Sequence, residues 1–290
     1  MNSIFSMTGS GRGSASGAGI RVQTDLRGVN NRFTDFVLNT PDDSLSFLEP
    51  QFKEMLKGRI SRGRVVCTIT VTEDASGSLN ISRPRLDAVA AALAQIRKAV
   101  PDATVNAVDI LSYPGVLHEH AATEAEIEKL CKQAFAAALD EFAASRAREG
   151  QNLREALLER LRLISAKLDP VGEMLGSLAQ SVREKLRGRI HALAPDLELD
   201  PGRLEQEVAL LSERADVQEE YDRLRSHVKQ CESILEAGGI VGKKLDFLMQ
   251  EFNREANTMS SKSASLELTQ ICVDLKVLIE QMREQVQNLE

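Results

Sequence analysis

The chain has 290 residues, enough for two packed domains, and 42% of them are apolar, which permits a substantial core. It contains no continuous apolar run of about 18 residues, so we expect no membrane-spanning helix. The formal net charge of −7 argues against a protein that binds nucleic acid nonspecifically over its whole surface.

The charge is unevenly divided along the chain. Residues 1–64 hold nine Lys and Arg against six Asp and Glu, whereas the remainder holds 27 against 37. A basic N-terminal part beside an acidic remainder is compatible with local phosphate binding together with an acidic metal site.

The four cysteines are far apart in the sequence and show neither zinc-binding nor CxxC spacing. We therefore expect reduced and mostly buried thiols, as in a cytoplasmic protein. The first residues lack the basic and apolar regions of a secretory signal peptide, which also favours the cytoplasm.

Residues 1–120 are expected to form an α+β domain. Within it, GSGRGSASGAG at residues 9–19 shows neither helical nor strand periodicity and is expected to be a flexible connection. Alternating or β-branched residues predict three strands, and apolar periodicity predicts two helices. The expected strands lie at residues 20–27, 33–38 and 64–73, and the expected helices at residues 45–60 and 84–100.

From residue 122 onward the pattern is helical. Residues 125–149 and 151–187 form one long helix or two helices in series, with Gly150 as the candidate break or kink. We interpret residues 121–200 as a long helical connector.

Residues 201–290 are expected to form a helical C-terminal domain. Apolar residues recur there at three- and four-residue intervals, and their phase slips near Asp216. Glycines at positions 238, 239 and 242 predict a turn between two helices. The predicted fold class is therefore α+β, with an N-terminal α+β domain followed by a mainly α-helical C-terminal domain of long helices.

The two helices on either side of this turn carry many potential metal ligands. On the first, Asp216, Glu220, Arg223 and His227 recur at intervals that place them on one helical face. That face lies beside the apolar seam of the helix, so its residues are not needed for packing alone.

On the second helix, Glu251 and Glu255 are four residues apart and share a face. If the two helices pack antiparallel across the glycine turn, this face meets His227. Polar neighbours on the same helix are Asn253, Arg254 and Asn257.

Carboxylates combined with an imidazole suit a divalent cation such as Mn²⁺ or Mg²⁺. We expect Glu220, His227, Glu251 and Glu255 as its ligands, and the last three as catalytic residues. A structural alternative stays open, because charged residues at this spacing are usually solvated surface pairs and a single helical histidine is more often structural.

Basic side chains in the N-terminal part are candidates for contacts with the phosphate backbone of a nucleic acid. The alternative is a solvated helix end, where cations are favourable in any case. The residues expected to make such contacts, with RNA if the resemblance described next holds, are Arg12, Arg27, Asn30, Arg32, Arg59, Arg62 and Arg64, together with Arg223, Asn253, Arg254 and Asn257 from the C-terminal domain.

Several motifs resemble those of the YicC family of bacterial endoribonucleases. They are DVQEEYDRLRSHV, KKLDFLMQEFNREANT and VDLKVLIEQMREQVQNLE near the C-terminus, with SMTGSGR, LRGVNNRF, RGRVVCTITV and VDILSYPGV before them. The resemblance covers nearly the whole chain. It implies a metal-dependent endoribonuclease that acts on RNA as a ring-shaped homo-oligomer, expected to be a hexamer with the long helices at its interfaces.

The leading hypothesis is thus a cytoplasmic, metal-dependent endoribonuclease. One alternative is a noncatalytic RNA-binding adaptor that delivers RNA to another RNA-decay enzyme. A second alternative is a helical scaffold with no nucleic-acid role. The adaptor explains the basic residues but not the concentration of acidic, histidine and asparagine side chains.

Overall fold

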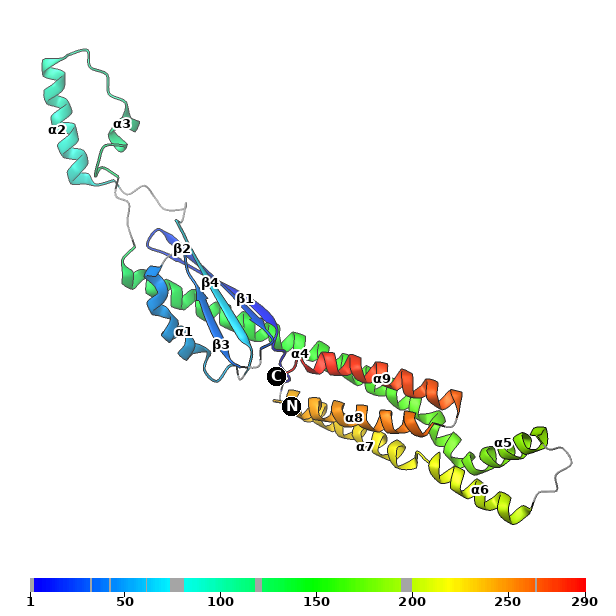
Figure 1. Ribbon diagram of the computed structural model, residues 1–290. Coiled ribbons are helices and arrows are strands. Elements are labelled where there is room, and N and C mark those ends of the chain that lie inside the picture. Colours follow the sequence, from blue (N-terminus) through cyan, green and yellow to red (C-terminus); the bar gives the residue numbers. More distant parts are fainter. Residues whose placement is uncertain are drawn as a thin grey trace.

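The computed structural model describes residues 3–31, 33–41, 43–60, 62–73, 81–117, 122–193, 200–263 and 265–290. An N-terminal sheet is followed by long helices, and the molecule is elongated (Figure 1). The predicted α+β class with a mainly helical C-terminal part is therefore confirmed. Among the described helices, none is both long and apolar enough to cross a membrane.

The sheet contains four strands in the order β1-β2-β4-β3. Their bounds are Gly9–Gly17, Ile20–Val29, Arg64–Glu73 and Asp35–Asn39, respectively. β1 and β4 flank β2 in antiparallel pairs, and β3 runs parallel to β4. Strands β2, β3 and β4 confirm the predictions made from alternation and β-branched residues.

Strand β1 corrects the expectation of a flexible connection at residues 9–19. It pairs with β2 along its whole length, and helix α4, Glu124–Gly176, packs directly on it. A Cβ atom at Gly11 or Gly13 would lie 2.2 or 2.0 Å from a backbone oxygen of α4. The glycines therefore permit close helix–strand contact, which neither hydrophobic periodicity nor β propensity detects.

One face of the sheet carries the first hydrophobic core. α4 and the short helix α1, Glu49–Leu56, both pack there, and Phe52 of α1 stacks on Phe135 of α4 with ring centroids 4.1 Å apart. A 3₁₀ helix, η1, Asp43–Leu48, leads into α1. Because side chains alternate along a strand, the opposite face carries Arg12, Arg27 and Arg64.

Helix α4 has 53 residues, which makes it about 80 Å long. It begins with a capping box between Thr123 and Glu126. Of the two arrangements left open by the sequence, the structure has one helix as far as Gly176, with no break at Gly150. Gly150 instead allows the N-terminal segment to approach, since a Cβ there would lie 2.1 Å from the carbonyl oxygen of Ile4.

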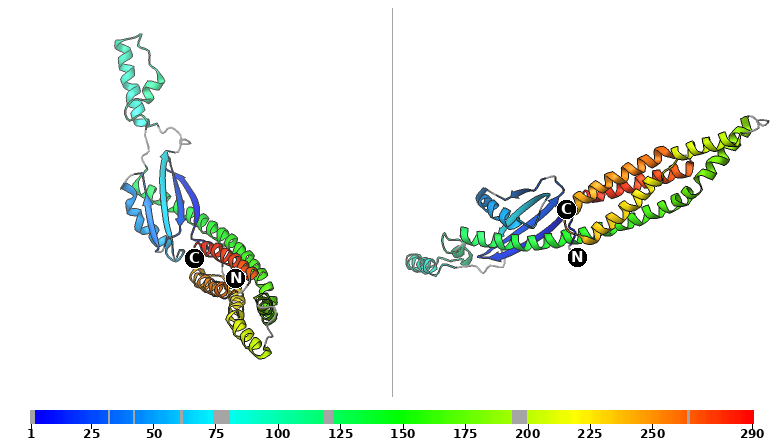
Figure 2. Two further views of the ribbon diagram at one scale, coloured as in Figure 1. Left: turned by 45° about the vertical axis from the view of Figure 1, so that its right-hand side comes forward. Right: turned by 90° about the horizontal axis from the view of Figure 1, so that it is seen from below.

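The second half of α4 forms a bundle with three later helices, α7, Gln218–Ala237, α8, Gly242–Lys262, and α9, Leu266–Val286 (Figure 2). The phase of the apolar pattern was predicted to slip near Asp216, and the structure has there the break between α6, Pro201–Arg214, and α7. Helix α5, Leu178–Leu193, pairs with α6 at one end of the molecule. Helices α2, Arg83–Ala99, and α3, Ala107–Leu111, project from the other end (Figure 1).

The two chain ends meet where the sheet joins the bundle. The amide of Met7 donates to the carbonyl of Asn288 at 2.8 Å, and that of Glu290 to Phe5 at 3.0 Å. The buried guanidinium of Arg146 donates to the carbonyl of Ser6 and to the Glu290 carboxylate. The amides of Val241 and Gly242 also donate to the carbonyl of Glu290, at 3.0 and 3.1 Å, so this junction fixes the N-terminal end of α8 relative to the sheet.

Candidate metal centre

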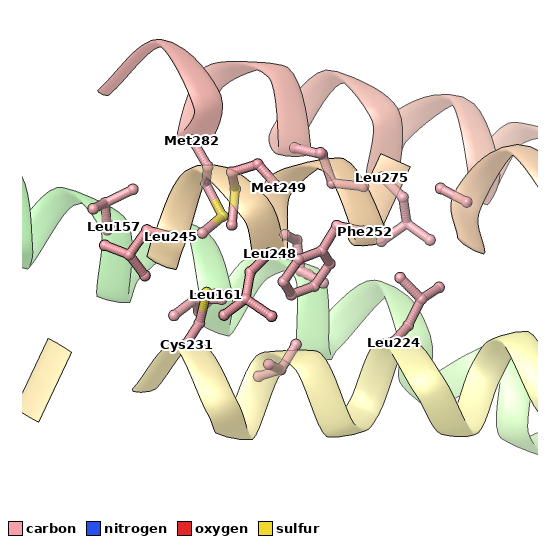
Figure 3. Close-up of a cluster of buried hydrophobic side chains, with 14 of the residues drawn as sticks. Leu157, Leu161, Leu224, Cys231, Leu245, Leu248, Met249, Phe252, Leu275 and Met282 are labelled. Atoms are coloured by element: carbon pink, nitrogen blue, oxygen red, sulfur yellow. The ribbon is translucent and has the colours of Figure 1, made fainter. Parts of the chain in front are cut away.

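Helices α7 and α8 run antiparallel and are joined by the predicted glycine turn. Gly238 and Gly239 have φ angles of 67° and 83°, which favour glycine over other residues. Leu224 and Cys231 of α7 face Leu248 and Phe252 of α8 in the bundle core (Figure 3). This packing also brings together the polar residues that lie beside the apolar face of each helix.

His227, Glu251 and Glu255 form the one group of metal-ligating side chains found among the described residues. Each offers a ligand atom, and these three atoms lie within 4.8 Å of one another. Glu255 is buried, whereas His227 and Glu251 are partly exposed. The structure thus brings together the three residues that the sequence analysis expected to be catalytic.

The ring nitrogens of His227 are buried and have no hydrogen-bond partner in the described part of the chain. The Phe252 ring packs against the imidazole, with centroids 5.6 Å apart. A buried polar atom without a partner destabilises the folded state. A cation held jointly with the two carboxylates would satisfy one nitrogen and fits this donor set.

Arg223 borders the three residues and makes two ion pairs. Its Nη1 atom lies 3.1 Å from Oε1 of Glu255, and its Nη2 atom contacts Glu219. The hydrogen bond to Glu255 is the largest influence that raises the pKa of Arg223. The sequence analysis expected Arg223 to contact phosphate. In the structure its guanidinium also balances the charge of the buried Glu255 carboxylate.

Glu220 does not join the group. It is buried two helical turns from His227, and its Oε1 atom accepts a hydrogen bond from Lys262 at 2.8 Å. Its Oε2 atom has no partner among the described residues. Asp216, considered as a further ligand, instead accepts a hydrogen bond from the amide of Gln218 at the start of α7.

Lys262 is a residue that the sequence analysis missed. The hydrogen bond that Lys262 donates to Glu220 raises the pKa of Lys262, so its ammonium stays charged. It lies seven residues after Glu255, and so on nearly the same helical face. In the sequence, a lysine on the same face of α8 as Glu255 was the signal that could have indicated a protein partner for Glu220.

The polar residues of α8 that were expected to contact RNA lie next to the centre. Asn257 donates to Asn253 at 2.8 Å on the exposed side of the helix. Arg254, with 70% of its side chain exposed, is 4.0 Å from Glu251. These side chains are available to a ligand that approaches the carboxylates.

Most of the N-terminal residues expected to bind RNA have protein partners. Arg12, Arg59 and Arg64 form ion pairs with Asp25, Asp140 and Asp35, respectively. Asn30 and Arg62 donate to the backbone carbonyls of Gln287 and Asn31.

Two expected contacts differ from the others. Arg27 is exposed on the outer face of the sheet. Arg32 lies outside the described residues. Three of the arginines expected to bind phosphate are thus paired with aspartates, which reduces the positive charge that they offer to a ligand.

The sequence of the chain matches a known class of proteins. The N-terminal region of the YicC-like endoribonucleases matches residues 4–155, and their C-terminal part matches residues 171–290. The chain therefore belongs to the YicC-like endoribonuclease family, which confirms the resemblance found in the sequence.

Two relatives extend over nearly the full chain. A Haemophilus influenzae protein named "Probable endoribonuclease YicC" is 39% identical over 271 residues, which cover 92% of each chain. A Clostridioides difficile protein of the same name is 29% identical over 294 residues, covering 99% of each chain.

Proposed function

We propose that the chain is a divalent-metal-dependent endoribonuclease whose metal is held by His227, Glu251 and Glu255. Membership of the endoribonuclease family supports an RNase-related function. The observation that carries the metal site is the convergence of three ligand atoms within 4.8 Å. The ring nitrogens of His227, which are buried and have no hydrogen-bond partner among the described residues, support it independently.

The donor set bears on the choice of cation. Mg²⁺ prefers oxygen ligands, whereas Mn²⁺ accepts an imidazole beside carboxylates. We therefore propose Mn²⁺ ahead of Mg²⁺. When bound, the cation would polarise the scissile phosphate and lower the pKa of a water molecule.

The residues of the chain have distinct roles in this proposal. Glu255, which is buried, and His227, which is partly exposed, would hold the cation, and the packing of α7 on α8 fixes their positions. Glu251, whose side chain is 28% exposed, would use one carboxylate oxygen as a ligand and the other to accept a proton from the attacking nucleophile. Arg223 and the exposed Arg254 contact phosphate oxygens.

RNA would be bound chiefly through its backbone, with Arg27 as the most available cation on the outer face of the sheet. The hexameric ring expected from the family resemblance and the cytoplasmic location stay predictions.

The test uses protein stripped of metal with a chelator and an end-labelled RNA. Cleavage should be absent in the stripped protein and return with Mn²⁺, more strongly than with Mg²⁺. RNA binding should weaken as salt rises, and Arg27→Gln should lower both the affinity and the salt dependence. Protein that binds RNA but leaves it intact with every divalent metal would instead be an adaptor.

A further inference from the structure

Helix α8 has an outward face that carries an exposed aromatic ring. Leu245, Leu248 and Phe252 of this helix lie in the bundle core (Figure 3). Phe247 lies on the opposite side of the helix and is 61% exposed. The other aromatic rings of Phe or Tyr on α7 and α8, Tyr221 and Phe252, are partly or fully buried. Packing within the chain therefore does not account for an aromatic residue at position 247.

Phe247 shares its face of α8 with a ligand of the proposed metal centre. Glu251 follows it by four residues and Arg254 by seven, so the three side chains line one face of the helix. Four residues of an α-helix rise about 6 Å, which places the ring one turn from Glu251. Glu251 is partly exposed, and the side chain of Arg254 is 70% exposed. A ligand at the metal centre can thus reach the Phe247 ring along the surface of one helix.

Two lysines lie on the other side of Phe247 from the metal centre. Lys243 and Lys244 precede the ring by four and three residues, and both are exposed. Neither ammonium forms an ion pair with a described residue. The carboxylate nearest to them in the sequence, Asp246, accepts a hydrogen bond from Gln250 at 3.2 Å. The positive charge of the two lysines is therefore available to an anion.

An aromatic ring between a metal centre and two available ammonium groups matches the chemistry of an unpaired nucleotide. The face of a base can stack on such a ring only where the base is not held inside a duplex. Stacking of this kind accepts any base, because every base has a π-face. The neighbours of Phe247 one turn before and after it on this face are charged, which favours RNA over the apolar surface of a protein partner.

We propose that Phe247 stacks on an unpaired base next to the cleaved bond, and that Lys243 and Lys244 hold the phosphate beyond this base. The proposal rests on the proposed nuclease function, since it takes the metal centre as the position of the cut. It defines the substrate as RNA that is single-stranded on this side of the cut, whatever base stands there.

The first test measures the affinity of metal-free, full-length protein for a single-stranded RNA, so that no cleavage is needed. Phe247→Ala should weaken binding by about fivefold to 150-fold, the range found for loss of one base–aromatic stack. Phe247→Trp should keep the affinity, whereas Phe247→Leu, which is apolar but cannot stack, should not. Phe47→Ala is the matched control, because Phe47 is 43% exposed in η1, outside the helix bundle.

The second test locates the stacked base. In a series of RNAs that each lack one base but keep the backbone, one position next to the cleaved bond should weaken binding to wild type as much as Phe247→Ala does. With Phe247→Ala the same missing base should have no further effect, because the interaction is already lost. A purely structural role of Phe247 would not produce this coupling.

The third test concerns the lysines. The double variant Lys243→Gln, Lys244→Gln should reduce the slope of log affinity against log salt by about 1.4, the value for two phosphate contacts on a single strand. The matched control is Lys229→Gln, Lys276→Gln, which removes two exposed lysines of α7 and α9 and should leave the slope unchanged.

Three results would overturn the proposal. They are unchanged RNA affinity in Phe247→Leu, no coupling between Phe247→Ala and any missing base, and a change in the mass of the protein in solution with Phe247→Ala. The last result would assign the ring to a contact between proteins. Failure of the proposed nuclease gives a different result, in which wild type cleaves RNA with no divalent metal while its RNA affinity still depends on Phe247.

Discussion

The Nη1 atom of Arg223 lies 3.1 Å from the Oε1 atom of Glu255, so a half-exposed guanidinium covers a buried carboxylate. Their side chains are 49% and 4% exposed, respectively. Arg223 therefore sits between solvent and the deepest ligand of the proposed metal centre. A cation bound by Glu255 would be repelled by this guanidinium, and an RNA phosphate would be attracted by it.

Arg223→Gln should separate these two effects. Loss of the positive charge should tighten Mn²⁺ binding by about threefold to tenfold, because a like charge is removed beside the site. Cleavage should nevertheless require more RNA for half-maximal rate, since a phosphate contact is lost. Calorimetric Mn²⁺ titration and the RNA dependence of cleavage check the two effects, and weaker Mn²⁺ binding would show that Arg223 is needed to position Glu255.

His227→Leu should stabilise the metal-free protein. The substitution removes two buried nitrogens that have no hydrogen-bond partner in the described ranges and whose desolvation costs about 1–3 kcal/mol, and it keeps an apolar contact with Phe252. It should also abolish stabilisation by Mn²⁺, which for wild type is about 2.7 kcal/mol at a metal concentration of 100 times Kd.

The matched control for that experiment is His191→Leu. His191 is exposed near the end of α5, so its substitution should change neither value. Urea unfolding with and without Mn²⁺ measures both. A His227→Leu protein that is less stable without metal and still gains stability from Mn²⁺ would contradict the assignment.

Gly13→Ala should destabilise the sheet. A Cβ at this position would lie 2.0 Å from the carbonyl oxygen of Ala134, so α4 must move away from β1. We expect a loss of about 2–3 kcal/mol in the free energy of unfolding. Gly188→Ala is the control, because nothing lies within 4 Å of its added Cβ, and it should stabilise α5 by about 0.5–1 kcal/mol.

The four cysteines should be unreactive in the native protein. Burial raises the pKa of Cys67 and Cys231 to about 12, and that of Cys131 and Cys272 to about 11. At pH 8 a thiol with a pKa of about 11 is thiolate in only about one molecule in a thousand, and the thiolate is the reactive form. Ellman's reagent should therefore label no cysteine before unfolding and all four afterwards.

The sequence predicts the parts of the fold that follow periodicity. Strand β2 alternates buried Val22 and Leu26 with polar residues, and α7 buries Leu224, Val228 and Cys231 at helical spacing. These elements can be predicted from the sequence because one face of each is apolar and the other is polar.

One wrong prediction, the flexible connection around Gly13, and one open alternative, the break at Gly150, both involve a glycine that serves a long-range contact. Gly13 lies in strand β1 and Gly150 lies inside helix α4, yet glycine at either position is the residue type that usually interrupts a strand or a helix. Their reason is the approach of a partner distant in the sequence, Ala134 for Gly13 and Ile4 for Gly150. A local pattern contains no information about such a partner.

The residues of the candidate centre could be predicted from the sequence because they, like the helices, follow a regular helical spacing. His227, Glu251 and Glu255 follow from helical spacing combined with an antiparallel turn. Glu220 shares the spacing, but the structure pairs it with Lys262, a contact that depends on where α8 ends. Pairing between charged groups on different helices needs the packed structure.

The most direct test compares Mn²⁺-dependent cleavage of one end-labelled RNA by wild type, Glu251→Gln and His227→Ala, purified in parallel. Glu236→Gln is the control, since Glu236 is an exposed carboxylate on the same helix as His227. Removal of a metal ligand should cost more than about 100-fold in rate, because even groups that only support ligands contribute 10- to 100-fold. The account predicts this loss in the first two variants, with RNA binding retained and the control fully active; equal cleavage by all four proteins would contradict it.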